Sequence, residues 1–183
     1  MQNPYADFDF STTQRDLLLG IDLSNEFIYG ILGSEHAAEI VPWAAWFFEH
    51  FQGRRVLTMD THGPNYLDTQ EGRLLPVLHG QKGTQGWELV EPIRKLVKTS
   101  DLVFEKDTFG SIEVYSQARH TIYDHIYLMG AKTGICVLAN AVMAKTARPE
   151  AEIRILSKLC TCVTKDSHKT AIDAMRLLQM TIM

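Results

Sequence analysis

Apolar runs of strand length alternate along this chain with stretches that have the period of an amphipathic helix. Repeated strand–helix alternation favours right-handed crossover connections and a parallel sheet with helices on both faces. We therefore predict a three-layer α/β/α fold with a central parallel sheet, a Rossmann-like arrangement. The expected strands are 17–22, 55–59, 102–105, 125–129 and 152–156, and the expected helices are 35–51, 87–98, 112–119, 135–145 and 166–178.

Length and composition narrow the class of protein. A chain of 183 residues with 45% hydrophobic content suits one compact domain with a full core, so we predict a single domain over 1–183 with 1–15 as an N-terminal extension. That extension is polar and lacks the apolar core of a signal peptide, and no apolar run approaches the roughly 18 residues of a membrane span. The formal charge of -4 argues against nucleic-acid binding. We expect a small-molecule partner or a second copy of the chain, and neither nucleic acid nor membrane.

The cysteines indicate a reducing compartment. There are three of them, an odd number, and Cys160 and Cys162 stand one residue apart, where a mutual disulfide would be strained. We therefore predict a cytoplasmic protein with free thiols.

An aspartate, a lysine and a cysteine each follow an apolar run: Asp22, Lys106 and Cys136. Because the carboxyl ends of neighbouring parallel strands converge on one crevice, we expect these side chains to share a site. The acid would take the thiol proton, and the cation would lower the thiol pKa. Cys136 also falls near the first turn of an expected helix, where the helix dipole favours a thiolate. By position alone, a buried structural cysteine is an equally good interpretation.

A second cluster lies in the long loop that follows the second expected strand. It comprises Asp60, His62, Glu71 and His79. Residues two apart in an extended segment face the same side, so Asp60 and His62 can reach one ion. Two imidazoles and a carboxylate suit zinc, iron or manganese in an open catalytic site, with Glu71 as a fourth ligand or as the partner of a metal-bound water. A D-x-H tripeptide alone is frequent, however, and more often caps a turn or faces solvent.

Five segments of the chain, in order, resemble motifs of the isochorismatase-like cysteine hydrolases, and within them the nicotinamidase-like branch. They cover most of the chain from residue 22 to the last expected helix. Asp22–Phe27 is similar to D-x-Q-N-D-F, Asp60–His62 to D-x-H, His79–Gly86 to H-C-x-x-G-T-x-G, Lys106–Ser111 to K-x-x-F-[SG]-[AS], and Gly130–Val137 to G-x-x-T-[DG]-x-C-V.

The resemblance implies a cysteine amidohydrolase that converts nicotinamide, or a related heteroaromatic carboxamide, to the acid and ammonia. Cys136 would form a thioester, Asp22 would act as the general base, and Lys106 would stabilise the thiolate and orient the aspartate. The backbone N–H groups of Lys132 and Cys136 would form the oxyanion hole, after a non-proline cis peptide between Ala131 and Lys132. Such an enzyme acts on linear amide bonds and would serve pyridine nucleotide salvage.

The resemblance also implies a metal held by Asp60, His62 and His79, with Glu71 as an extra ligand. Zinc is the first choice, with iron or manganese as alternatives. In nicotinamidases the metal binds the pyridine nitrogen of the substrate and so positions the ring.

Three aromatic residues within or near the motifs, Phe27, Tyr66 and Phe109, are predicted to contact an aromatic substrate. Family members commonly associate, so we also expect a homo-oligomer, a dimer or a tetramer. The apolar helical stretch around Trp43 could provide its interface, although core packing is the more common use of such a stretch.

The chain departs from the family pattern at Ser24, Glu26 and Gly80, and most notably at two positions of the nucleophile turn. Lys132 stands where a small residue is usual, and Gly134 replaces a common acidic residue. These departures leave two alternatives open. One is hydrolysis of another carboxamide or carbamoyl compound, and the other is a catalytically silent member of the family that binds a ligand.

Overall fold

The computed structural model describes residues 2–183, which contain one six-stranded sheet in the order β3-β2-β1-β4-β5-β6. Every neighbouring pair of strands is parallel, which confirms the predicted sheet. The strands are β1 (Leu17–Ile21), β2 (Arg54–Asp60), β3 (Leu102–Lys106), β4 (His125–Ala131), β5 (Glu152–Thr161) and β6 (Thr181–Ile182).

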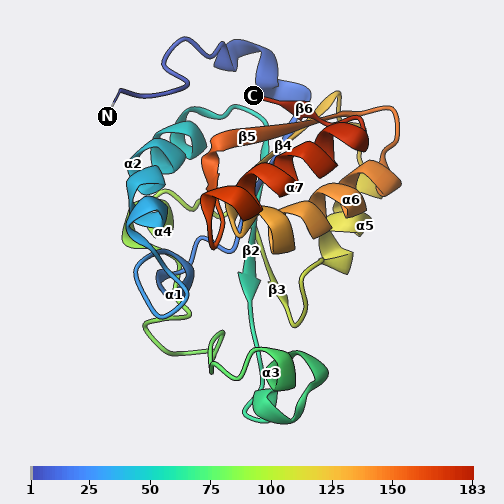
Figure 1. Ribbon diagram of the computed structural model, residues 1–183. Helices are drawn as coiled ribbons and strands as arrows, with labels where there is room; N and C mark the ends of the chain where they lie inside the picture. Colours follow the sequence, from blue (N-terminus) through green and yellow to red (C-terminus); the bar gives the residue numbers. More distant parts are fainter. Residues whose placement is uncertain (1) are drawn as a thin grey trace.

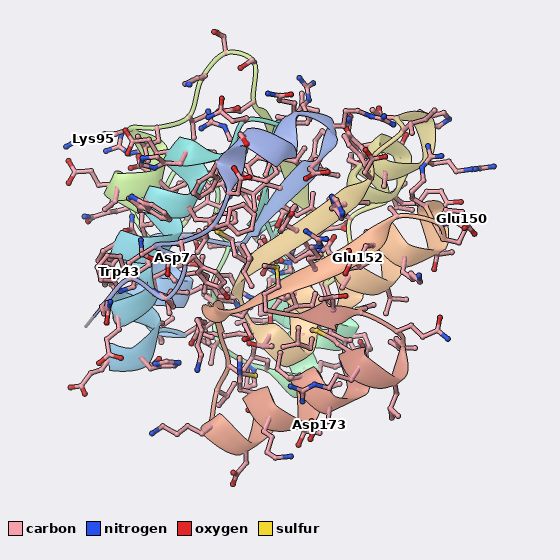
Figure 2. The ribbon with its side chains drawn as sticks, turned by 90° about the horizontal axis from the view of Figure 1, so that it is seen from above. Asp7, Trp43, Lys95, Glu150, Glu152 and Asp173 are labelled. Carbon is pink, nitrogen blue, oxygen red and sulfur yellow. The ribbon has the colours of Figure 1, made fainter. Side chains whose placement is uncertain are left out.

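Helices cover both faces of this sheet, as predicted: α2 and α4 lie on one side, and α5, α6 and α7 on the other (Figure 1). Figure 2 shows Trp43 of α2 and Asp173 of α7 on different sides of the molecule. The helices are α1 (Asn25–Ile28), α2 (Glu35–His50), α3 (Gln70–Leu74), α4 (Glu91–Arg94), α5 (Ile112–His120), α6 (Leu138–Ala147) and α7 (Lys165–Leu177), with 3-10 turns η1 (Phe10–Arg15) and η2 (Tyr66–Asp68) and a π-helical turn η3 (Thr133–Val137).

The alternation of side chains along β1 divides the core into two layers. Leu17, Leu19 and Ile21 pack with residues of α5, α6 and α7, whereas Leu18 packs with residues of α2. All of these side chains are buried, because β1 is central and both of its faces are covered. The strand therefore reads as a continuous apolar run.

The observed elements differ from the predicted ones in several places, including the short helices α1 and α3, which were not predicted. The helix predicted over 87–98 shrinks to α4, because the preceding segment is extended: Leu89 forms an antiparallel bridge with Ser24, and Val90 donates its N–H to the Leu23 carbonyl. Strand β5 extends five residues beyond the predicted end at residue 156. Strand β6 was not predicted at all.

Residues 2–15 of the predicted N-terminal extension pack onto the α2 side of the sheet. Their aromatic members Tyr5, Phe8 and Phe10 lie with ring centroids 5.7, 4.9 and 5.0 Å from that of Phe47 in α2. The Tyr5 hydroxyl donates a hydrogen bond to the carbonyl of Met183. This segment therefore contributes apolar contacts to the core.

The loops that follow the strands at their carboxyl ends gather at one edge of the sheet. In Figure 1 the arrowhead of β2 points toward α3, at the end of the molecule opposite to the marked termini. Open parallel sheets bind ligands at this edge. Among residues 2–183, no helix is long and apolar enough to cross a membrane.

Candidate active site

The ammonium group of Lys106 joins two aspartates at the carboxyl edge of the sheet. Its Nζ lies 2.7 Å from Oδ2 of Asp22, which follows β1, and 2.8 Å from Oδ1 of Asp60, the last residue of β2. Lys106 itself ends β3. Burial alone would lower the pKa of Lys106, but the charges of Asp22, Cys136 and Asp60 raise it above its usual range. Lys106 is therefore a permanent cation at neutral pH.

Asp22 is fully buried and held in an unusual backbone conformation, with a φ of 48°. The hydroxyl of Thr58 donates to its Oδ1 over 2.7 Å. Burial raises the pKa of Asp22; the ion pair with Lys106 opposes this, and the neighbouring charge of Asp60 adds to it. A carboxylate with a raised pKa is a stronger base, so Asp22 suits proton transfer from a thiol.

The thiol of Cys136 completes this cluster. Lys106 Nζ donates to its Sγ over 3.6 Å, and the cysteine lies in η3, at the beginning of the helical segment that continues as α6. The sequence predicted that the side chains of Asp22, Lys106 and Cys136 would lie close together. They do so in the structure, where Lys106 contacts both of the others. The charge of Lys106 acts on the thiol pKa in the predicted direction, but it does not bring that pKa below its ordinary value. Burial raises the pKa of Cys136 well above its ordinary value, Asp22 adds to this, and the charge of Lys106 opposes it only in part.

The turn before the cysteine has the predicted backbone: the peptide bond between Ala131 and Lys132 is cis. The carbonyl of Lys132 then accepts the N–H groups of Ile135 and Val137, over 3.0 and 3.2 Å. These two bonds fix the turn around the sulfur. The amides of Lys132 and Cys136 remain our predicted oxyanion donors.

Asn140 stabilises the turn that carries the nucleophile. This residue was not predicted from the sequence. Its Nδ2 donates to the carbonyls of Cys136 (2.9 Å) and Phe109 (3.0 Å), and its Oδ1 accepts the N–H of Ser111. The side chain is fully buried. Asn140 therefore ties the cysteine to the loop that follows Lys106. A polar residue one helical turn after the nucleophile, in an otherwise apolar helix, was the available signal.

Asp60, His62 and His79 form a group that could hold a metal ion, with their ligand atoms within 4.8 Å of one another. Asp60 Oδ2 lies 3.1 Å from His62 Nε2 and 3.2 Å from His79 Nε2. His79 donates from Nδ1 to the Val77 carbonyl over 2.7 Å, which directs Nε2 toward the group. Such a bond to the outer nitrogen is typical of metal-binding histidines.

The donor set fits a divalent transition metal. Burial opposes ionisation of Asp60, but hydrogen bonds from His62 and His79 and the charge of Lys106 hold its pKa well below the usual range. An ionised carboxylate beside two imidazoles, with atoms close enough for bonds of about 2 Å to one ion, is the chemistry that zinc and iron accept. Glu71, predicted as an extra ligand, lies in α3 with Oε1 3.9 Å from His62 Nε2. Burial raises the pKa of Glu71.

The three predicted substrate-contacting aromatics have different surroundings. Phe27 lines a cavity of about 340 Å³, and its ring lies edge-on to His79 with centroids 5.8 Å apart. Tyr66 is buried against the imidazoles of His62 and His79, outside the residues that line this cavity. Phe109 is 44% exposed and also outside them. The geometry favours substrate contact for Phe27 and a role in packing the histidines for Tyr66; substrate contact by Tyr66 and Phe109 stays a prediction.

Comparisons with solved structures show the same fold. A nicotinamidase/pyrazinamidase from Bacillus subtilis is 23% identical, with 92% of this chain and 99% of that chain covered and a TM-score of 0.79. A pyrazinamidase from Pyrococcus horikoshii in complex with zinc is 20% identical, with coverage of 92% and 98% and a TM-score of 0.80. An N-carbamoylsarcosine amidase from Thermoplasma acidophilum is 24% identical, with coverage of 92% and 95% and a TM-score of 0.75. A search of curated protein sequences gives no significant match.

The sequence itself matches a family model. The model of the isochorismatase domain covers residues 16–183, from the end of η1 through every strand of the sheet. The matched region holds the cysteine with its acid and lysine, as well as the aspartate and two histidines suited to a metal. With its parallel sheet, its motifs and this match in agreement, the chain belongs to the isochorismatase family of hydrolases.

Proposed function

We propose that this protein is a metal-dependent cysteine amidohydrolase of nicotinamidase type. It would hydrolyse nicotinamide, or a related heteroaromatic carboxamide, to the acid and ammonia. The observation that carries the proposal is the position of Lys106 Nζ, 2.7 Å from Asp22, 3.6 Å from the sulfur of Cys136 and 2.8 Å from Asp60 of the candidate metal group. One cation thus joins a base, a nucleophile and a metal ligand.

In the proposed mechanism Asp22 takes the proton from Cys136 as the sulfur attacks the amide carbonyl. Lys106 stabilises the developing thiolate, and its pair with Asp22 keeps the carboxylate oriented. The backbone amides of Lys132 and Cys136 donate to the oxyanion of the tetrahedral intermediate. Asp22 then returns the proton to the departing nitrogen, and ammonia leaves a thioester on Cys136. Water hydrolyses the thioester, with Asp22 acting again as the base.

The raised pKa values of Cys136 and Asp22 favour this sequence over a resting thiolate. Burial disfavours the charged form of both groups, and the charge of Lys106 opposes this effect at each of them. Lys106 offsets the charge on whichever member of the pair is ionised.

Asp60, His62 and His79 would hold the metal, with Glu71 as the proposed extra ligand. When bound, the metal would position the substrate's ring nitrogen and withdraw electron density from the carbonyl. We propose zinc, with iron or manganese as alternatives, on the basis of the two imidazoles and one carboxylate.

We further propose a cytoplasmic location, a single domain and a homo-oligomeric state. The three cysteines, Cys136, Cys160 and Cys162, are free and buried, which supports the first of these. The single domain follows from the length and composition of the chain, and the homo-oligomeric state follows from the family resemblance.

Ammonia release from a panel of amides led by nicotinamide tests this function. The protein would be stripped of metal and then reloaded with zinc, iron or manganese. Cys136→Ala is the test variant. Cys160→Ala is the matched control, because that cysteine is also buried but lies in β5 away from Lys106. Turnover of nicotinamide that needs both metal and Cys136 supports the proposal. Turnover of other amides alone replaces the substrate, and no turnover of any amide contradicts the proposal.

A further inference from the structure

Lys132 is a second buried cation at the site, and the fold gives it no carboxylate. Lys132 is only 5% exposed to solvent. Its Nζ donates one hydrogen bond, of 3.0 Å, to the carbonyl of Phe27. Among residues 2–183, no aspartate or glutamate forms an ion pair with it, and the titratable groups that affect its pKa are the thiols of Cys162 and Cys136. An ammonium group has three donors, and buried charges are normally paired.

The two buried lysines of the site differ in the partners of their ammonium groups. Lys106 is equally buried but lies within 2.8 Å of both Asp22 and Asp60, so its charge is compensated twice over. Lys132 has only a neutral carbonyl. Burial lowers the pKa of Lys132, and only the two thiols oppose this. A bound anion would restore the missing compensation.

Lys132 also lines the cavity of about 340 Å³ that adjoins the nucleophile turn. The rest of the wall is mainly apolar and includes Phe27, Ile31, Ile135 and Val163. Ile135 directly precedes Cys136, and the ring of Phe27 lies edge-on to His79 of the candidate metal group. An apolar pocket of this size with one cationic group suits a small molecule whose apolar body carries one anionic group.

We propose that Lys132 is a specificity-determining residue that pairs with a carboxylate on the substrate. The preferred substrate class is then a small carboxamide that bears a carboxylate besides the amide to be cleaved. This rests on the proposed amidase function, which it narrows. The reaction is unchanged: the C–N bond breaks, water supplies the oxygen, and the products are ammonia and a dicarboxylic acid.

Matched pairs of amides test the proposal. The first pair is nicotinamide and its 5-carboxy derivative, and the second is butanamide and succinamate. We expect the wild-type protein to show a kcat/KM at least 10-fold higher for the carboxylate-bearing member of a pair. Lys132→Met should lower this ratio by about 10- to 100-fold, the usual range for a charge-assisted hydrogen bond. Lys132→Arg should retain most of the preference, because it keeps the charge.

The control variant is Lys165→Met, which removes the same charge from an exposed position near the cavity. It should leave the ratio unchanged, so that a general attraction of anions to the protein is separated from pairing with Lys132. A ratio that is equal in the wild type and Lys132→Met, or a wild-type preference for the neutral amides, overturns the proposal. If Lys132→Met does not fold, the wild-type ratio and that of Lys132→Arg decide it.

A binding measurement separates this proposal from the proposed function. In Cys136→Ala, calorimetry would compare succinamate with butanamide, with and without Lys132→Met. Lys132-dependent binding of succinamate supports the anion-binding site even if no amide is turned over, in which case the amidase function alone fails. Turnover that depends on Cys136 but ignores the carboxylate, with equal binding of both amides, leaves the amidase intact and overturns the role of Lys132.

Discussion

Strand β2 has a buried charged cluster at each end, and the two are built differently. At its beginning Arg55 pairs with Asp101 through Nε, over 2.9 Å, and through Nη2, and donates from Nη1 to the Phe48 carbonyl. At its end Asp60 shares Lys106 with Asp22, so that one lysine faces two carboxylates. The first cluster pairs one cation with one carboxylate, whereas the second has two carboxylates for one ammonium group.

The difference indicates which cluster serves stability and which serves chemistry. Both Arg55 and Asp101 side chains are about 5% exposed, and each of the three guanidinium nitrogens donates to Asp101 or to a backbone carbonyl. In the second cluster Asp22 has a raised pKa and Asp60 has an oxygen beside two imidazoles. Unbalanced buried charge of this kind is typical of a functional site.

The largest expected effect comes from removing the nucleophile beside the unbalanced cluster. Cys136→Ala should lower kcat on the best amide by about 10³-fold or more, because no other group can form the thioester. The free energy of unfolding should change by less than about 2 kcal/mol, since only a sulfur atom is lost. Steady-state kinetics and urea denaturation measure the two quantities. Substantial residual activity would remove Cys136 from the mechanism.

Neutralising one acid in each cluster tests the comparison directly. Asp101→Asn should destabilise the protein by about 3–5 kcal/mol, because it leaves Arg55 buried without its counter-charge. Asp22→Asn should cost less than about 1 kcal/mol, because Lys106 keeps Asp60 and a buried charge is removed, and it should abolish turnover. Urea denaturation of the metal-free variants gives the free energies. Equal destabilisation by the two variants would contradict the distinction.

Metal binding to Asp60, His62 and His79, in the second cluster, should stabilise the folded protein. At a free metal concentration 100 times its Kd, the free energy of unfolding should rise by about 2.7 kcal/mol, and chelation should reverse this. His62→Ala should eliminate the response, because it removes one of the three donor side chains. His50→Ala, on the exposed end of α2, is the control and should respond like the wild type. Thermal melts with and without zinc measure this, and an unchanged response in His62→Ala would disprove the site.

The smallest expected effect concerns the pH dependence of the thiol. Because burial raises the pKa of Cys136, less thiolate is present at pH 7 than for an ordinary cysteine. Alkylation by iodoacetamide in the metal-free protein should be slower than in the unfolded chain by about 10-fold for each unit of the rise. The rate should still increase with pH beyond the range where an ordinary cysteine levels off. Peptide mass spectrometry separates Cys136 from Cys160 and Cys162, and a plateau near neutral pH would contradict this.

The fold class was predicted, and the ends of β1, β2 and β3 were predicted to within one residue, because both depend on local pattern. An apolar run followed by Asp22 or Asp60 marks the end of a buried parallel strand, and these residues reached the same edge. Strand β5 was shortened in the prediction because Ser157 and Lys158 interrupt its apolar pattern. In the structure Ser157 pairs with the C-terminal residue, a contact between distant parts of the chain.

The same limit applies to the candidate site. Motifs supplied the identity of its residues, but the shared pairing of Lys106 with two aspartates depends on the strand order β3-β2-β1. The support from Asn140 and Thr58 depends on contacts across elements. The raised pKa of the thiol was missed for a further reason: a sequence shows the neighbouring charges but not the depth of burial.

Asp60 makes the nucleophile cluster and the candidate metal group inseparable. Its Oδ1 pairs with the ammonium group of Lys106, and its Oδ2 contacts the imidazoles of His62 and His79. Mutational losses on the two sides should therefore not add: a double variant of Lys106 and His62 should lose less than the sum of its single variants. During evolution, a change on one side of Asp60 would alter the constraints on the other. The two groups are therefore expected to be kept or lost together.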